Sequence, residues 1–364
     1  MTSRVLQIDL LKGLAILSVL FHHTVLISST PKLILANWSF GQAVPVFICI
    51  MGLTMGMSFN RRGASTLREL FSKSYFVRRF DRIVYPVLLL ILLEVVYGAI
   101  FFAVRGSSPL IITPQILLGW LPITGPGNYF VSIAIQFIFI FPLIYYGYRR
   151  APRFTLITCF GVNLAFVLLS SAASEPVNAF FRSYFYIPRY IALIALGLWI
   201  ADETIGGETS SFSKRDRLIL AGGGIGVLFL LVDSVKLSLG PINALQVAIY
   251  HSPLFGIAQL VSLQFYVAML VLLGIKYLPR TETNPLVRAL ARMGRLSYHI
   301  FLMQIVYFSL LSGGIAMRIH LYVHGYYAWE VTELIVNISV CTTLGIGFAL
   351  FEAYSKRALR FEID

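Results

Sequence analysis

The chain has 364 residues, of which 58% are hydrophobic and only 12% are charged. Soluble domains carry roughly 25% charged residues, so this composition excludes an ordinary soluble fold. The 29 Lys and Arg outnumber the 16 Asp and Glu, giving a net charge of +13. Such an excess indicates either a polyanionic partner or, in a membrane protein, the side of the membrane on which the loops lie.

Cysteine usage indicates neither a disulfide framework nor a metal site. Cys49, Cys159 and Cys341 lie far apart, each inside an apolar run. Metal ligands and paired cysteines would be expected at closer, regular spacings. We therefore predict no metal.

The N-terminal segment has some features of a signal peptide, because Arg4 precedes an apolar stretch. However, Asp9 and Lys12 interrupt that stretch, and no convincing small-x-small cleavage site follows it. We interpret the segment as a retained first transmembrane helix.

Ten apolar segments approach the length of about 20 residues that one helix needs to cross a bilayer. No internal repeat is evident, and no connecting stretch has the length of a second soluble domain. We therefore predict an all-α polytopic membrane protein in which residues 1–364 form a single membrane domain. The predicted spans are 8–29, 40–59, 83–104, 129–148, 154–172, 186–202, 217–238, 255–275, 296–317 and 331–354.

Lys and Arg are distributed unevenly between the two sides that ten spans define. The side holding the N-terminus carries 22 of them, the opposite side carries six, and Lys12 lies inside the first span. Cytoplasmic loops are enriched in Lys and Arg, so this asymmetry predicts that both termini are cytoplasmic. The positive charge is thereby explained mainly by orientation, and we expect no nucleic-acid partner.

Ionisable residues inside the first span are candidates for function, because they are costly in lipid. Lys12 and His23 are eleven residues apart, so on a helix they face the same way, roughly 16 Å apart along the axis. His22 points about 80° away from that line, and Asp9 can pair with Lys12 at i, i+3. The alternative is purely structural: a helix-end lysine reaching the interface and a histidine filling a polar gap.

Five motifs occur in order along the chain. They are Asp9-x-x-Lys12-Gly13-x-Ala15-Ile16 followed by His23; Pro45-Val46-Phe47-Ile48-Cys49-Ile50-Met51-Gly52; Arg79-Phe80-Asp81-Arg82-Ile83-Val84-Tyr85-Pro86; Tyr129-Phe130 through Gln136-Phe137 to Phe141-Pro142-Leu143; and Met293-Gly294-Arg295-Leu296-Ser297-Tyr298-His299-Ile300-Phe301-Leu302. Together they resemble the acyltransferase-3 family of integral membrane acyltransferases. The chain departs from the family pattern at Lys12, where many members have Arg, at Met51, where Ser is usual, and at Gln304, where His is frequent.

The resemblance implies transfer of an acyl group, most often acetyl from acetyl-CoA, to a hydroxyl of a cell-envelope carbohydrate or glycolipid. A hydroxyl nucleophile needs a base with a pKa near neutrality, which is the property of histidine. His23 is the candidate, either as general base or as a covalent acyl carrier. Glu94 lies twelve residues beyond Arg82, so we predict that it reaches the depth of His23 and orients it. The alternative is that Glu94 pairs with another helix.

The phosphates of coenzyme A require cationic donors. Arg79 and Arg82, spaced i, i+3 and therefore expected on one face of a helix in a basic cytoplasmic stretch, are predicted to hold them together with Lys12. The competing explanation is the positive-inside bias itself, which needs no ligand. The resemblance favours the phosphate site.

Two further features have structural interpretations. Gly222-Gly223-Gly224-x-Gly226 lies inside a predicted span with no preceding strand, so we expect close helix packing and not a nucleotide site. His299 is expected to be a histidine of the helix bundle or its interface.

The sequence therefore predicts a multi-pass protein of the inner (plasma) membrane that uses acetyl-CoA as acyl donor. The alternative is a transporter or flippase in which the same buried polar residues relay ions or substrate. Inverted repeats of the kind common in transporters are not detected. The acceptor and the oligomeric state cannot be read from the sequence.

Overall fold

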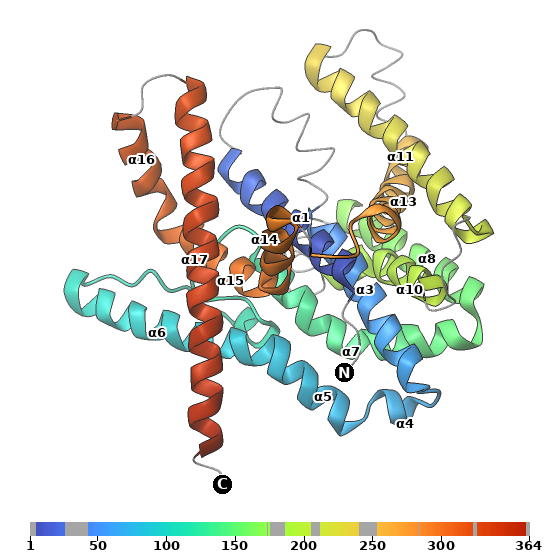
Figure 1. The fold of residues 1–364 in the computed structure, drawn as a ribbon, viewed down its shortest axis with the longest axis horizontal. Coiled ribbons are helices and arrows are strands. Elements are labelled where there is room, and N and C mark those ends of the chain that lie inside the picture. The colour runs from blue at the N-terminus through green and yellow to red at the C-terminus, as the bar shows by residue number, and fades with distance from the viewer. Residues whose placement is uncertain are drawn as a thin grey trace. The chain divides into compact units, whose positions relative to one another are not determined.

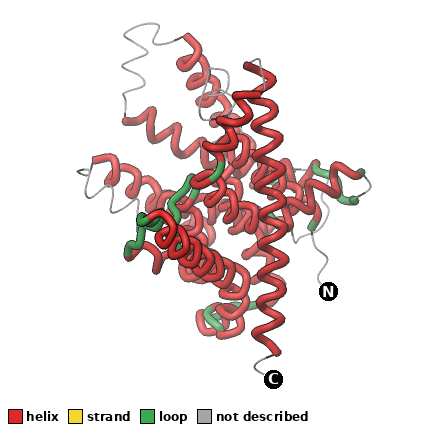
Figure 2. The backbone as a smooth tube through the Cα atoms, turned by 90° about the vertical axis from the view of Figure 1, so that its left-hand side faces the viewer, coloured by secondary structure: helices red, strands yellow, loops and turns green. Residues whose placement is uncertain are grey.

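A computed structural model of the chain describes residues 5–25, 43–172, 174, 186–204, 212–239, 253–282, 284–322 and 326–361. Within these ranges the regular secondary structure is entirely helical, and short loops connect the helices (Figure 1, Figure 2). The prediction of an all-helical protein is confirmed for this part of the chain.

Seven helical stretches of the described residues are long and apolar enough to cross a membrane. The chain is therefore a polytopic membrane protein. The seven stretches are Leu6–Thr24, Ala43–Arg62, Leu67–Arg105, Asn128–Arg150, Pro152–Ser170, Gly256–Tyr277 and Ala328–Ala358.

The other three predicted spans are not among these seven stretches. Helix α10 (Ile191–Thr204) has only 14 residues, and α11 (Lys214–Leu239) has 26 residues and begins with four charged ones. The predicted span 296–317 is divided between α15 (Ser297–Leu310) and α16 (Ser312–Tyr322). A count of ten spans stays a prediction, and its residues 26–29 and 40–42 lie outside the described ranges.

The described residues separate into two compact units, and the helices α1 (Leu6–Val25) and α7 (Asn128–Arg150) contribute to both of them. A single domain over residues 1–364 stays a prediction. Unit 1 takes residues from 1–11, 27–72 and 139–282. Besides the second half of α7 it contains α3 (Ala43–Arg62), α4 (Leu67–Leu70), α8 (Pro152–Ala172), the 3-10 turn Ile187–Tyr190, α10, α11 and α13 (Pro253–Tyr277).

Small residues let α3 and α10 pack backbone to backbone in the core of unit 1. A Cβ atom at Gly197 would lie 2.0 Å from the carbonyl oxygen of Cys49, and one at Gly52 would lie 2.3 Å from that of Ile194. Helices in lipid gain association energy mainly from such close packing, because lipid tails are as apolar as the side chains. The α3–α10 contact therefore depends on glycine at these positions.

The glycine cluster of α11 serves the same purpose. A Cβ atom at Gly226 would lie 2.6 Å from the carbonyl oxygen of Ser262 on α13, and one at Gly222 would lie 2.7 Å from the ring of Phe265. Gly223 faces Met269 in the same way, whereas Gly224 has nothing within 4 Å. The expectation of close helix packing is confirmed for three of the four glycines.

Unit 2 takes residues from 12–26, 73–138 and 283–364. It contains most of α1, the first half of α7, α5 (Lys73–Arg79), a π-helical turn (Phe80–Val84), α6 (Tyr85–Arg105), the 3-10 turn Pro114–Leu118, α14 (Pro285–Arg295), α15, α16 and α17 (Tyr326–Phe361). The long helix α17 packs beside both α15 and α16 (Figure 1). A Cβ atom at Gly345 of α17 would lie 2.6 Å from the side chain of Ile300.

We predict that Gly197→Ala destabilises the protein by about 1–3 kcal/mol, because the added methyl group overpacks the α3–α10 contact. Gly161→Ala in α8 is the matched control, since a Cβ atom there meets nothing within 4 Å. That substitution should be neutral or slightly stabilising, because alanine favours helix. Thermal unfolding of the purified variants in detergent measures both. A midpoint for Gly197→Ala at or above that of Gly161→Ala would contradict the prediction.

Candidate active site

His23 lies near the C-terminal end of α1, in unit 2. Its half-buried ring lies 5.5 Å from the ring of His22 and 5.7 Å from that of Phe308 on α15, measured between centroids. Its Nδ1 atom is buried and neither accepts nor donates a hydrogen bond within the described residues. One nitrogen of the imidazole is therefore not committed to a partner in this part of the chain.

Lys12 lies on the same continuous helix as His23, as predicted, and is also half-buried. The eleven residues between them correspond to roughly 16 Å of helix. Because α1 is uninterrupted from Leu6 to Val25, the predicted spacing along one face holds.

Glu94 is buried in α6, with 2% of its surface exposed. Its Oε2 atom accepts a hydrogen bond of 3.0 Å from the backbone N–H of Ile123, and its Oε1 atom has no hydrogen-bond partner among the described residues. No hydrogen bond joins Glu94 to His23 in this part of the chain. The idea that Glu94 orients His23 stays a prediction, and the contact that the carboxylate does make is with a loop.

That loop, residues 121–127, leads from the 3-10 turn into α7. Side chains of α15 bind its second half: Gln304 donates from Nε2 to the carbonyl oxygen of Pro126 at 3.0 Å, and Ser309 donates to that of Thr124 at 2.6 Å. A Cβ atom at Gly125 would lie 2.3 Å from the carbonyl oxygen of Ile305. The loop therefore lies directly against the backbone of α15.

The first half of loop 121–127 is closed by Asn128. Its Oδ1 atom accepts from the N–H of Leu121 at 2.9 Å, and its Nδ2 atom donates to the carbonyl oxygen of Leu121 at 3.2 Å. Gly127 has a φ of +88°, which favours glycine, and a Cβ atom there would lie 2.9 Å from the ring of Phe301. Both ends of the loop are thus held in one conformation.

A buried chain of polar side chains fixes α1 beside His23. The Tyr307 hydroxyl on α15 donates to Oδ1 of Asn337 on α17, and Nδ2 of Asn337 donates to the hydroxyl of Thr24 at 3.0 Å. Thr24 is the residue after His23. Since buried polar groups are costly when unpaired, this chain favours one register between α1, α15 and α17.

Arg79 is the last residue of α5 and is half-buried. Its guanidinium carbon lies 5.8 Å from the centroid of the Tyr75 ring. The Tyr75 hydroxyl donates to the carbonyl oxygen of Ile138 on α7 at 2.8 Å. Arg79 therefore stacks on a ring that is itself anchored to a neighbouring helix.

Arg82 lies in the π-helical turn Phe80–Val84 and is exposed. The expectation that Arg79 and Arg82 share one face of a regular α-helix is wrong, because a π-turn is wider than an α-helical turn. Two side chains hold the turn: Lys356 donates to the carbonyl oxygen of Asp81 at 2.7 Å, and the Tyr298 hydroxyl donates to that of Ile83 at 2.9 Å. Such single π-turns occur frequently at functional sites.

His299 pairs with another side chain in a way that gives it a structural role. Its Nε2 atom pairs with the carboxylate of Glu352 on α17, and Lys356 pairs with the other oxygen of Glu352 at 2.5 Å. Lys356 also pairs with Asp81 at 2.8 Å. The histidine thus belongs to a network that ties α17 to α15 and to the π-turn, in agreement with the expectation of a bundle histidine.

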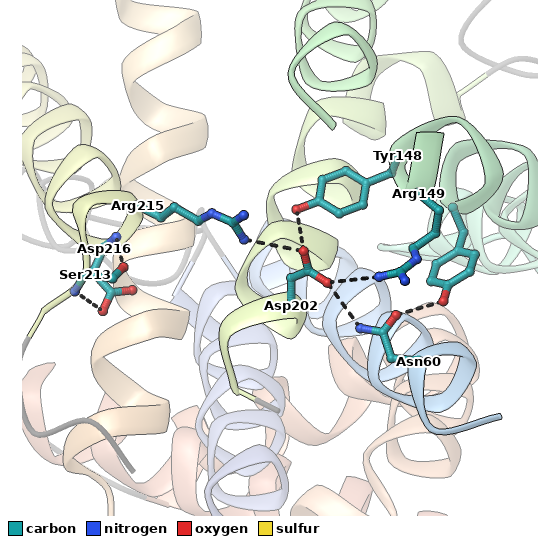
Figure 3. A network of polar contacts seen from close by, with 8 residues as sticks. Asn60, Tyr148, Arg149, Asp202, Ser213, Arg215 and Asp216 are labelled. Atoms are coloured by element: carbon teal, nitrogen blue, oxygen red, sulfur yellow. Dashed lines mark hydrogen bonds and ion pairs between the residues drawn. The ribbon is translucent and has the colours of Figure 1, made fainter. Parts of the chain in front are cut away.

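In unit 1, a polar network surrounds Asp202 at the end of α10 (Figure 3). Its carboxylate pairs with Arg215 of α11 at 3.4 Å and with Arg149 of α7 at 3.7 Å. It also accepts from the Tyr148 hydroxyl at 3.4 Å and from Nδ2 of Asn60 at 3.4 Å. One carboxylate therefore joins the ends of four helices, α3, α7, α10 and α11.

The partners of Asp202 are themselves satisfied and well packed. Oδ1 of Asn60 accepts from the Tyr145 hydroxyl at 2.7 Å, and the Tyr145 ring packs 5.0 Å from that of Phe59. Nearby, Lys276 pairs with the buried Asp216 at 2.6 Å. This arrangement is typical of a structural network, and nothing in it resembles a substrate site.

Metal-ligating side chains do not gather anywhere in the described ranges: no group of three or more His, Cys, Asp or Glu could hold an ion. The three cysteines are buried and free.

Sequence reasoning missed the roles of Asp202, Gln304 and Ser309. In the sequence, Asp202 is only the last residue of the predicted span 186–202, and Gln304 is only a departure from a family motif. The signal for the loop was present in Gly-Trp-Leu-Pro-Ile-Thr-Gly-Pro-Gly-Asn at 119–128, because clustered Gly, Pro and Asn indicate an ordered turn. Its contact with α15 joins residues about 180 positions apart, which no local pattern reveals.

Comparisons with known proteins give one family match. A family profile described as an acyltransferase domain matches residues 5–351. A search of curated proteins and a search of solved structures each found no match.

We predict that Asp202→Ala destabilises the protein by about 1–3 kcal/mol, because the buried Tyr148 hydroxyl, Asn60 and Arg215 lose a common acceptor. Arg149→Ala is the comparison, since it removes a single 3.7 Å ion pair from a side chain that is 55% exposed. Exposed ion pairs contribute about 0–1 kcal/mol, so its effect should be smaller. Unfolding midpoints in detergent test the order. Equal midpoints for the two variants would show that Asp202 does not organise the network.

Proposed function

Because the chain belongs to the acyltransferase-3 family, whose profile covers residues 5–351, we propose that this membrane acyltransferase moves acetyl groups from acetyl-CoA to carbohydrate hydroxyls. The acceptor is a cell-envelope or exported carbohydrate or glycolipid. The observation that carries the proposal is the half-buried His23, whose Nδ1 atom has no hydrogen-bond partner among the described residues. A histidine with a free ring nitrogen can take a proton from a hydroxyl.

In the proposed reaction, the acceptor oxygen attacks the carbonyl carbon of the thioester while His23 takes the hydroxyl proton. The carbon–sulfur bond then breaks, the sulfur leaves with its electron pair, and the proton on His23 passes to it. The products are an O-acetyl ester and free coenzyme A. A variant of this route places the acyl group on His23 first, and the same residue is essential in both.

Glu94 is the second proposed catalytic-site residue, in support of His23. Its burial in α6 at 2% exposure supports a specific role, because a carboxyl group is expensive to place inside a membrane protein. The hydrogen bond that this carboxyl group accepts from the backbone N–H of Ile123 determines the form of that support.

The phosphates of coenzyme A are proposed to bind Lys12, Arg79 and Arg82. Arginine supplies planar, always-charged donors suited to phosphate, and lysine adds a point charge. The stacking of Arg79 on Tyr75 supports this role, because a preoriented guanidinium loses less freedom on binding. The roughly 16 Å from Lys12 to His23 along α1 suits the pantetheine arm of the donor.

We propose the inner (plasma) membrane as the location, with both termini cytoplasmic. The distribution of Lys and Arg supports this orientation, since 22 of the 29 fall on one side of the ten-span arrangement. Coenzyme A would then stay on the cytoplasmic side while the acetyl group reaches an acceptor near the outer end of α1.

We predict that His23→Ala lowers acetyl transfer by at least about a hundredfold, because general base catalysis contributes roughly 10²–10⁴. The assay uses purified protein in liposomes with radiolabelled acetyl-CoA and envelope carbohydrate from cells that lack the protein. His22→Ala is the control, since the neighbouring imidazole lies about 100° away from His23 around the helix. Unchanged acceptor labelling by His23→Ala would refute the assignment.

We predict that Arg79→Ala and Arg82→Ala each weaken acetyl-CoA binding by about tenfold, because each removes a charge-assisted hydrogen bond to phosphate. Arg78→Ala is the matched control: Arg78 is exposed on the same helix and donates to the Ser74 hydroxyl at 3.2 Å. Equilibrium binding of labelled acetyl-CoA to equal amounts of folded protein measures the effect. Binding equal to that of Arg78→Ala would remove these residues from the donor site.

A further inference from the structure

Loop 121–127 receives an unusual concentration of side-chain hydrogen bonds. Side chains from three helices bind its backbone: Glu94 from α6, Asn128 from the start of α7, and Gln304 and Ser309 from α15. Glu94 and Gln304 are 2% and 0% exposed. Buried polar side chains of this kind are costly unless they do something specific, and here they hold a short segment of backbone.

The anchored loop remains accessible at its centre. Leu121 and Ile123 are buried, whereas Thr124 is exposed and Gly125 to Gly127 are half-buried. A segment with fixed ends and an accessible middle can present backbone groups to a ligand without losing conformational freedom on binding.

The same stretch of α15 that binds the loop also contacts His23. Gln304 and Phe308 are four residues apart, so their positions on the helix differ by about 6 Å along the axis. Gln304 binds Pro126, and the ring of Phe308 lies 5.7 Å from that of His23. Ser309, the next residue, binds Thr124. The loop and the proposed base therefore adjoin one short segment of a single helix.

We propose that loop 121–127 is the acceptor-positioning wall of the active site, and that Glu94, Gln304 and Ser309 are the positioning residues that hold it. Glu94 thus supports His23 through the loop and α15, and not by a direct hydrogen bond. The ligand is a polyhydroxylated compound, because the buried acceptor oxygens Oε1 of Glu94 and Oε1 of Gln304 have no donor among the described residues. Hydroxyl groups supply such donors. This inference rests on the proposed function.

The decisive comparison is Glu94→Gln against Glu94→Ala. A glutamine oxygen still accepts the N–H of Ile123, so Glu94→Gln keeps the anchor while an amide NH2 group replaces the second acceptor oxygen and the charge is lost. If Glu94 positions the loop, hydrogen–deuterium exchange of residues 119–128 in Glu94→Gln should match that of the wild type. Glu94→Ala should raise the KM for the acceptor about tenfold, as expected for a lost hydrogen bond to a charged group, with little change in acetyl-CoA affinity.

Ser309→Ala and Ser312→Ala form a second, matched pair at the other end of the loop. Ser309 donates to Thr124 of the loop, whereas Ser312 donates at 2.9 Å to the carbonyl oxygen of Phe308, four residues earlier in the chain. Ser309→Ala should raise the acceptor KM, and Ser312→Ala should not. This pair also keeps the test valid if Glu94→Ala does not fold.

The experiment measures acetyl transfer from radiolabelled acetyl-CoA to graded amounts of envelope carbohydrate extracted from cells that lack the protein. Hydrogen–deuterium exchange of residues 119–128 is measured in parallel without any ligand. The expected result is faster exchange in Glu94→Ala than in Glu94→Gln. Exchange in Glu94→Gln as fast as in Glu94→Ala would overturn the proposal, as would exchange in Glu94→Ala unchanged from that of the wild type. If the wild type does not bind acetyl-CoA, the proposed function fails, whereas the exchange result still decides the anchoring.

Discussion

The structure depends on one constraint: within a membrane, a polar group that leaves water must find its partner inside the protein. Helices meet this requirement for their own backbone, which is why the described chain is helical wherever it is regular. The requirement is harder to meet where a helix ends or where backbone is irregular. Charged and amide side chains are found at such places, and they organise both units.

Unit 1 meets the constraint with packing and one carboxylate. Glycines on α3 and α10 bring two backbones together so closely that a Cβ atom at Gly197 would overlap Cys49. At the end of α10, Asp202 provides an acceptor for Tyr148, Asn60 and two arginines (Figure 3). A carboxylate with that many donors stabilises helix ends that would otherwise compete for water. This unit therefore has the features of a scaffold.

Unit 2 contains polar groups that a scaffold role does not explain. Its irregular backbone, in the π-turn and in loop 121–127, is bound by side chains from distant helices. These two segments adjoin the residues of the proposed donor and acceptor sites, Arg82 in one case and Glu94 in the other. Irregular backbone is tolerated at membrane depth only where protein or a water-filled cavity satisfies it. A catalytic site at such backbone can use N–H and C=O groups that a regular helix would pair within itself.

Much could be predicted from local pattern alone. The lengths of the apolar segments predicted helices at each of the ten proposed positions. The predicted spacing of Lys12 and His23 along one helix holds, because α1 is unbroken. The glycines of α11 were correctly interpreted as packing residues. By contrast, the prediction that Arg79 and Arg82 share one face of a regular α-helix is wrong, because composition does not distinguish a π-turn from an α-helix. The sequence likewise does not indicate that Glu94 is one of the side chains that bind loop 121–127.

Hydropathy and motif order indicate the class of protein and the chemistry of its residues, because these signals act over one helix at a time. Which polar groups meet depends on how the helices pack. Gln304 and Pro126 are 178 residues apart, and Tyr298 and Ile83 are 215 apart. Such pairs form because a buried donor must find an acceptor after the helices have packed, and that choice depends on packing geometry that no periodicity records.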